Sequence, residues 1–195
     1  GAWRISELED GPARIAARLG RAFEPVPGLS PATTPGARRA GVIEQRDGRV
    51  ALEVLVPLGR LSPAHARALA GAAGAAGAAG AAGDMETVVL TPWRTVVLLD
   101  LEPAEAGRLA GTLAAAGLVT GPGSPWTGVT ACTGRPGCAK SLADVQADAA
   151  RWVAERDGPP ELPVHWAGCE RRCGRPRARV IERVATGDGY VERRV

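Results

Sequence analysis

Residues 131–176, ACTGRPGCAKSLADVQADAARWVAERDGPPELPVHWAGCERRCGRP, contain all four cysteines of the chain. The cysteines form two pairs, Cys132-x5-Cys138 and Cys169-x3-Cys173, with thirty residues between the pairs. Four thiolates supplied by two loops are what an iron–sulfur cube needs, because each corner iron takes one cysteine. The spacing therefore favours a [4Fe–4S] cluster, with these four cysteines as its metal ligands.

Two other roles for the cysteines stay open on spacing alone. Structural zinc sites use pairs spaced by two to four residues, which the second pair satisfies and the first does not. A disulfide framework suits a secreted protein, yet the first residues lack the basic and then apolar pattern of a signal peptide. Free cysteines in such a chain predict a reducing, cytoplasmic location.

The composition limits the size of the fold and its partners. At 195 residues the chain has room for one large domain or two small ones with a real core. The net charge of +3 comes from 24 basic residues, of which Lys140 is the only lysine. This arginine bias, together with the excess of Ala and Gly, indicates a GC-rich genome rather than a nucleic-acid partner. No apolar stretch is long enough to cross a bilayer, so no membrane partner is expected.

The chain divides into three parts. Residues 1–40 form a lead-in, in which a helical stretch carries Ile15 and Leu19 one turn apart and a proline-rich linker follows. Residues 41–121 form a compact α+β unit. Residues 122–195 form an α/β unit that carries the cysteines.

The middle part has the element order of a ferredoxin-like fold. Strands rich in Val and Leu are expected over 49–57, 86–90 and 94–101. Helices are expected to begin at Ser62 and at Pro103, and a last strand follows Gly117. This order is the split βαβ arrangement. The Gly-Ala-Ala repeat over 71–83 is expected to extend the end of the preceding helix and to be poorly ordered, since each helical Gly costs about 1 kcal/mol.

The last part should deliver both cysteine pairs to one place. A strand over 127–131 leads into the first pair, and a strand over 163–168 leads into the second. The helix between them is expected directly behind Cys138, so that the first pair sits at its positive end. Its apolar face contains Leu142, Val145, Trp152 and Val153. A β-hairpin turning at 187–189 closes the unit, and both cysteine loops should reach the same end of the sheet.

The stretch TACTGRPGCAKSLADVQADAA, the strand LPVHWAG and the segment CERRCGRP together resemble the cluster half of the sulfite and nitrite reductase superfamily. The resemblance implies a ferredoxin-like unit followed by a [4Fe–4S] unit, in which Cys173 also bridges to a siroheme iron. GCERRCGRP and LTPWRTVVL resemble the precorrin-3B synthase branch in particular. The reductases have Pro and Asn where this chain has Glu170 and Arg171, which weakens the case for siroheme.

The resemblance also implies a function. It predicts oxygen-dependent hydroxylation of precorrin-3A with lactone formation, with electrons passing through the cluster from a ferredoxin or an NAD(P)H-linked reductase. The alternatives are a fragment of a siroheme-dependent sulfite or nitrite reductase and a non-catalytic electron-transfer module. The chain corresponds to only the second half of the family's pseudo-twofold plan. A missing N-terminal half or a second chain is therefore expected to complete the site, and no catalytic residue is assigned.

Cationic residues in or beside the cysteine segments, together with Arg94 of the segment TPWR, are candidate ligands of tetrapyrrole carboxylates. They are Arg94, Arg135, Lys140, Arg171, Arg172 and Arg175. Arginine binds carboxylates through paired hydrogen bonds, although a solvated face is an equally good interpretation of such a charge run. His165 is either satisfied by a neighbour or a ligand of a mononuclear non-haem iron. The sequence contains no Ser-His-Asp arrangement and no phosphate-binding loop.

Overall fold

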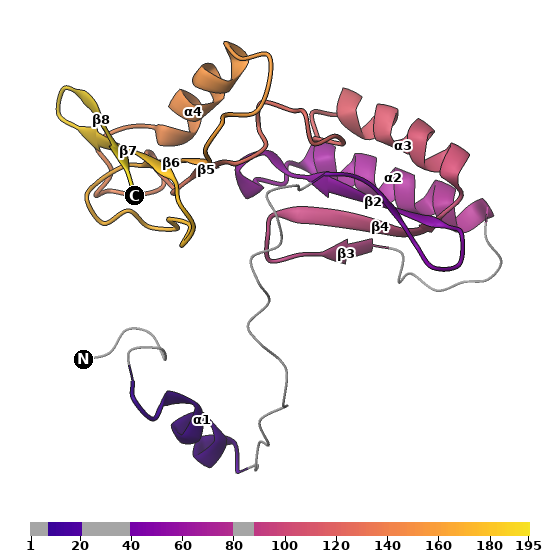
Figure 1. The fold of residues 1–195 in the computed structure, drawn as a ribbon, viewed down its shortest axis with the longest axis horizontal. Helices are drawn as coiled ribbons and strands as arrows, with labels where there is room; N and C mark the ends of the chain where they lie inside the picture. Colours follow the sequence, from indigo (N-terminus) through magenta and orange to yellow (C-terminus); the bar gives the residue numbers. More distant parts are fainter. Residues whose placement is uncertain (1–7, 21–39, 80–87) are drawn as a thin grey trace. The chain divides into compact units, whose positions relative to one another are not determined.

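The computed structural model describes residues 8–20, 40–79 and 88–195 (Figure 1). The chain forms two compact units, Gly1–Gly36 and Ala37–Val195, which are described separately. The first contains helix α1 (Gly11–Leu19), which ends at Gly20 in the left-handed conformation. The expected lead-in helix is thus confirmed, and the proline-rich linker falls outside the described residues.

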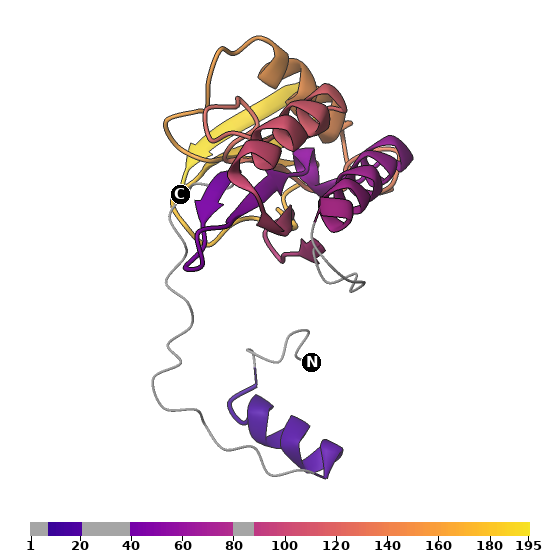
Figure 2. The ribbon, with the colours of Figure 1, turned by 90° about the vertical axis from the view of Figure 1, so that its right-hand side faces the viewer.

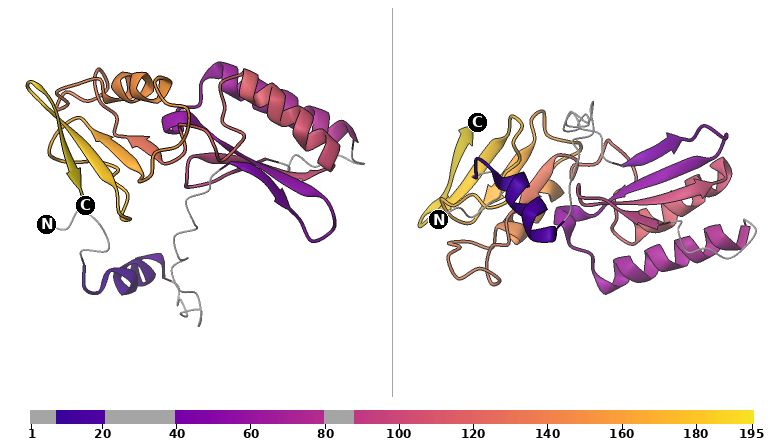
Figure 3. Two further views of the ribbon diagram at one scale, coloured as in Figure 1. Left: turned by 45° about the horizontal axis from the view of Figure 1, so that its top comes forward. Right: turned by 90° about the horizontal axis from the view of Figure 1, so that it is seen from below.

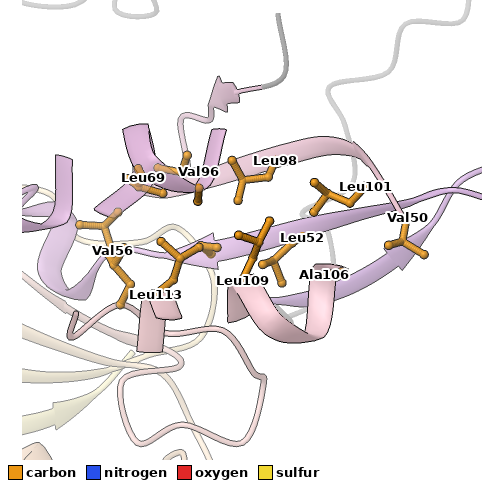
Figure 4. Close-up of a cluster of buried hydrophobic side chains, with 13 residues drawn as sticks. Val50, Leu52, Val56, Leu69, Val96, Leu98, Leu101, Ala106, Leu109 and Leu113 are labelled. Carbon is orange, nitrogen blue, oxygen red and sulfur yellow. The ribbon is translucent and has the colours of Figure 1, made fainter. Parts of the chain in front are cut away.

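The second unit begins with an antiparallel sheet in the order β1-β2-β4-β3. Its strands are β1 (Gly41–Glu44), β2 (Val50–Leu55), β3 (Val88–Leu90) and β4 (Thr95–Leu101). Helices α2 (Pro63–Ala79) and α3 (Pro103–Ala115) lie on one face of the sheet (Figures 1 and 2). Leu52, Leu98 and Leu113 are fully buried between the layers (Figure 4). The sequence pattern predicted this α+β arrangement, and the structure confirms it.

The last strand of the ferredoxin-like order is reduced to one residue. Val119 pairs with Leu55 in an isolated antiparallel bridge, with N–H to oxygen distances of 2.9 and 3.0 Å. Strand β1, which the sequence analysis did not predict, pairs with Val50 to Glu53 along the same edge of β2. Because β1 takes most of that edge, little backbone is left for a strand after α3.

Helix α2 begins as the sequence predicts and continues into the Gly-Ala-Ala repeat. The backbone N–H of His65 donates to Oγ of Ser62 at 3.1 Å, and the backbone N–H of Ser62 donates to Nδ1 of His65 at 3.2 Å. The helix then runs through the first Gly-Ala-Ala triplets to Ala79. The expected extension of the helix into the repeat is confirmed as far as Ala79, and Ala72 is buried in the core. The poor order of the repeat stays a prediction. The end of the repeat lies outside the described residues.

The second sheet has the order β5-β6-β7-β8. Its strands are β5 (Val129–Ala131), β6 (Val164–Ala167), β7 (Ile181–Thr186) and β8 (Gly189–Arg194). The pairs β5–β6 and β6–β7 are parallel, and β7–β8 is the expected antiparallel hairpin. Helix α4 (Val145–Ala154) packs on one face through Val145, Ala149 and Val153 (Figure 3).

Helix α4 starts later than the sequence analysis expected. Its N-cap is Asp144, whose carboxylate accepts from the backbone N–H of Ala147 at 3.1 Å. Leu142 precedes the helix and is half exposed, so its assignment to the buried helical face is wrong. An Asp cap satisfies a free N–H group at the first turn, and Ser141 and Leu142 are instead used by the loop.

A short 3₁₀ turn, η2 (Pro57–Gly59), follows β2 of the first sheet and contacts the second sheet. Leu58, with φ 53°, packs against the core of the second sheet. Arg60 donates to the side-chain oxygen of Gln146 on α4 at 2.6 Å. No helix in the described residues is long and apolar enough to cross a membrane. The boundary predicted near residue 121 stays a prediction.

Replacing Leu52 by Ala should lower the free energy of unfolding by about 2–5 kcal/mol, because this central side chain is 0% exposed and its removal leaves a cavity. Chemical denaturation monitored by circular dichroism measures the change. Leu61→Ala is the matched control, since Leu61 is 46% exposed and should change stability by no more than about 0.5 kcal/mol. Equal losses in the two variants would contradict the assigned core.

Candidate metal centre

The two cysteine-bearing loops leave the same end of the second sheet. Ala131 of β5 pairs with Trp166 of β6 in parallel register. Cys132 follows β5 directly, and Gly168 and Cys169 follow β6. Because the carboxyl ends of parallel strands share one edge, both loops begin side by side, as the sequence predicts. All four cysteines are free, and Cys173 is exposed while the others are partly buried.

The first thiol loop, residues 132–144, is folded on itself against the start of α4. The N–H of Cys138 donates to the oxygen of Gly134 at 2.8 Å, and Nε of Arg135 donates to the oxygen of Ser141 at 2.7 Å. The side chain of Gln146 donates to the oxygen of Cys132 at 3.1 Å. Cys132 therefore lies near the helix start, whereas Cys138 is seven residues before Val145. The expectation that both cysteines lie at the helix N-terminus is therefore wrong for Cys138.

Gly168 joins the first thiol loop to the second thiol loop, residues 168–176. Its N–H donates to Sγ of Cys132 at 3.2 Å, and its oxygen accepts from the N–H of Leu142 at 2.8 Å. A Cβ atom on Gly168 would lie 1.9 Å from Oγ and 2.8 Å from Cβ of the buried Ser141. Only glycine fits this approach. Neither Gly168 nor Ser141 was singled out from the sequence, since their contact depends on the two loops meeting.

A row of polar residues crosses the face of the second sheet opposite α4. Thr130, His165, Glu182 and Arg193 are paired in register across β5, β6, β7 and β8. His165 and Glu182 are both 0% exposed. The second thiol loop bonds to this row, because Nε2 of His165 lies 3.1 Å from the oxygen of Cys173. The row thus holds the loop that carries the second cysteine pair.

His165 acts in this row as a neutral, satisfied side chain. Nδ1 lies 2.8 Å from Oγ1 of Thr130, and Nε2 donates to the oxygen of Cys173. Burial lowers the pKa of His165 to about 4; the Cys173 bond opposes this shift, and the charges of Arg94 and Arg175 add to it. Both ring nitrogens are used, which favours a satisfied histidine over the iron-ligand alternative.

The predicted carboxylate-binding residues differ in their surroundings. Arg172 and Arg175 face Glu182, with Nε to carboxylate distances of 3.7 and 3.3 Å. Arg171 and Lys140 are exposed and have no ion pair within the described part of the chain. Arg135 is exposed but commits its Nε to the Ser141 oxygen. Of the three arginines on the second thiol loop, Arg171 is therefore the one without an ion pair among the described residues.

Arg94 is a half-buried cation of the first sheet whose charge acts on His165. It ends the tight turn between β3 and β4 with φ 65°, and its oxygen accepts from the N–H of Val56 at 3.0 Å. Its side chain packs on Gly59, where an added Cβ would lie 2.9 Å from Cδ of Arg94. Burial lowers the pKa of Arg94, and its charge reaches His165. Among the described residues this guanidinium has no carboxylate partner.

The four cysteines are the candidate ligands of this centre. In the described ranges no three His, Cys, Asp or Glu side chains are arranged to hold one metal ion. A structural zinc needs its four ligands around one centre, whereas a [4Fe–4S] cube spreads four thiolates over four irons. Four free thiols on two adjacent loops, one accepting a backbone N–H, are compatible with the cube. Cluster binding stays a proposal.

Two comparisons with known proteins bear on this arrangement. Residues 43–116 match the nitrite/sulfite reductase ferredoxin-like half domain. A solved structure of the NirA protein of Mycobacterium tuberculosis is similar, with a TM-score of 0.65 and 24% identity over 96% of this chain and 36% of that one. This chain thus spans about a third of the length of NirA. No curated protein matches it.

The fold is therefore that of a nitrite/sulfite reductase ferredoxin-like half domain followed by an α/β unit with four free thiols. The half-domain match supports the superfamily that the sequence resembles. At this identity the likeness to NirA shows the fold alone, and it extends over both sheets.

Changing Gly168 to Ala should separate the two thiol loops, because the new methyl group overlaps Ser141. We expect a loss of about 1–3 kcal/mol in unfolding free energy and loss of cluster uptake, measured by denaturation and by iron analysis. Gly158→Ala is the control, since no atom lies within 4 Å of its Cβ position. A Gly168→Ala protein with unaltered stability and iron content would contradict the contact.

Proposed function

We propose that this chain is the iron–sulfur part of a precorrin-3B synthase-like oxidoreductase. The observation that carries the proposal is that both cysteine-bearing loops begin at the same end of the parallel β5–β6 pair, with all four thiols free. The ferredoxin-like half domain before them supports the superfamily. The branch is proposed on the resemblance of GCERRCGRP and LTPWRTVVL to precorrin-3B synthases.

The four cysteines would hold the [4Fe–4S] cluster. When bound, such a cluster supplies one-electron transfer at a potential tuned by hydrogen bonds to its sulfurs. The N–H of Gly168, at 3.2 Å from Sγ of Cys132, is a donor of this kind. His165 and Glu182 hold the second thiol loop, and Ser141 and Arg135 hold the first. These residues position the ligands and are not assigned a chemical step.

The proposed reaction is a monooxygenation of precorrin-3A. One atom of O₂, as the new hydroxyl group, and a carboxylate oxygen of a side chain, as the lactone, add across one C=C double bond of the tetrapyrrole, and the other atom of O₂ leaves as water. An electron donor, a ferredoxin or an NAD(P)H-linked reductase, must supply two electrons and two protons must be taken up. A second half or chain is proposed to complete the substrate site, since this chain spans about a third of NirA.

Substrate carboxylates are proposed to bind the cationic side chains that form no ion pair with a carboxylate among the described residues. Arg94, Lys140 and Arg171 have no carboxylate partner among the described residues. Arg94 is half-buried, and a carboxylate that binds it would offset the cost of that burial. Arg172 and Arg175 already face Glu182. They are therefore weaker candidates than the sequence alone suggested.

The absorption spectrum of the anaerobically reconstituted chain tests the cofactor. A [4Fe–4S] cluster gives broad visible absorption, siroheme adds strong bands in the red, and zinc gives neither. Each of Cys132→Ser, Cys138→Ser, Cys169→Ser and Cys173→Ser should abolish stable cluster uptake, because a corner iron loses its thiolate. About four irons and four sulfides retained in all four variants would contradict the ligand assignment.

The choice of substrate-binding cation can be tested with a porphyrin octacarboxylate as the probe. Arg171→Gln should weaken its binding by about 1.5–3 kcal/mol, because one charge-assisted contact is lost. Fluorescence titration measures the affinity. Arg67→Gln, at an exposed position on α2, is the control and should leave it unchanged. Equal affinities of the Arg171 variant and the unaltered chain would show that Arg171 is solvated and not a ligand.

A further inference from the structure

Glu182 is a carboxylate in a place that water does not reach. It lies on β7, is 0% exposed, and is paired in register with His165, which is also 0% exposed. Within the described part of the chain neither of its side-chain oxygens accepts a hydrogen bond. A buried carboxylate without hydrogen-bond donors is unfavourable unless opposite charges lie close to it. The sequence analysis gave this residue no role.

The opposite charges come from the second thiol loop. Nε of Arg175 is 3.3 Å from Oε1 of Glu182, and Nε of Arg172 is 3.7 Å from Oε2. The two arginines flank Cys173 in the sequence. Two guanidinium groups from one loop thus converge on one buried carboxylate. The loop cannot lift from the sheet without leaving that carboxylate unpaired.

A second carboxylate balances the remaining positive charge. Glu170 lies 2.5 Å from Arg172 and 3.3 Å from Arg193, the member of the polar row on β8. The pKa of Glu170 is lowered, chiefly by its hydrogen bond to Arg172 and then by the neighbouring arginine charges. Because Glu170 is exposed, this pair adds less than the buried one. It nevertheless ties the loop to a third strand.

The backbone of the second thiol loop needs such fastening. Arg172 has φ 49°, a left-handed conformation that non-glycine residues adopt at a cost, and Gly174 has φ 79°. A loop with these conformations keeps one shape only when its surroundings hold it. The surroundings here are the oxygen of Cys173 on His165 and the two guanidinium groups on Glu182.

We infer that Glu182 is a positioning residue: its buried carboxylate fastens the second thiol loop to the sheet through Arg172 and Arg175, and so fixes Cys169 and Cys173. The alternative is that both arginines turn outward to bind a substrate anion. That movement would leave the carboxylate buried without a counter-charge, which is strongly unfavourable. This inference does not depend on the proposed cofactor or substrate, because it concerns the loop itself.

Hydrogen exchange on the metal-free chain tests the fastening. The N–H of Arg172 donates to the oxygen of Cys169, and the N–H of Arg175 donates to the oxygen of Arg172. In Glu182→Gln these two amides should exchange about tenfold faster or more, because the loop opens more often. Glu192→Gln is the control: Glu192 lies on β8, pairs with Arg183 on β7 and is 48% exposed. Unaltered exchange in the Glu182 variant would overturn the inference.

A cycle of variants separates charge from packing. Arg172→Gln with Arg175→Gln leaves the carboxylate unpaired, so the midpoint of unfolding should fall. Adding Glu182→Gln removes the buried charge and should restore part of that loss, because neutral groups in place of all three ions are tolerated. If the arginines only packed against the sheet, the losses would add. Additive losses would overturn the inference. The triple variant also decides the case if Glu182→Gln alone folds poorly.

Discussion

The parallel pairing of β5 with β6 is the constraint on which the proposed centre depends. It places Cys132 beside Gly168 at the carboxyl end of both strands. An antiparallel pairing of the same strands would send the two loops to opposite ends of the sheet. Helix α4 supplies the crossover that a parallel pair requires, and Trp166 and Ala149 fill the core between helix and sheet. The closeness of the two thiol loops thus depends first on the strand topology and only then on the local sequence.

The first sheet contributes to the centre as well as to the core. Leu58 packs into the core of the second sheet, and Arg60 bonds to Gln146 on α4. Arg94, at the end of the β3–β4 turn, packs its side chain on Gly59 in the same segment as Leu58 and Arg60, and its positive charge contributes to the lowered pKa of His165. A half-buried cation without a carboxylate partner among the described residues is an unusual feature for a protein to retain. It gives the ferredoxin-like half domain a direct part in the proposed anion recognition.

Local patterns predicted most of the fold. Runs of Val and Leu located β2, β3 and β4, and Ser62 and Pro103 marked the starts of the long helices. Strand β1 was missed because GVIE is too short and too exposed to show an alternating pattern. The fourth ferredoxin-like strand was predicted to be longer than it is. Strand β1 occupies most of the edge of β2 on which it would pair, and the sequence does not show which strand pairs with which.

The thiol positions could be predicted from spacing, but their supports could not. Glu182 is the second residue of β7, which in the sequence looks like any charged strand, and its burial follows from its register with His165. The pairing of Arg172 and Arg175 with Glu182 could not be predicted, because a sequence does not show which carboxylate an arginine faces. Nothing in the sequence distinguishes Gly168 from the other glycines among the 26, because its role depends on its contact with Ser141. Each of these roles depends on contacts between residues far apart in the chain.

Native mass spectrometry of the anaerobically reconstituted chain tests the central claim most directly. If the two loops act as one binding site, the mass should rise by one cluster of about four irons and four sulfides per chain. The increase should appear in a single step, without intermediate species in which iron is bound by only one of the two cysteine pairs. A chain that takes up one zinc ion and no iron, or that binds metal on each loop separately, would contradict the account.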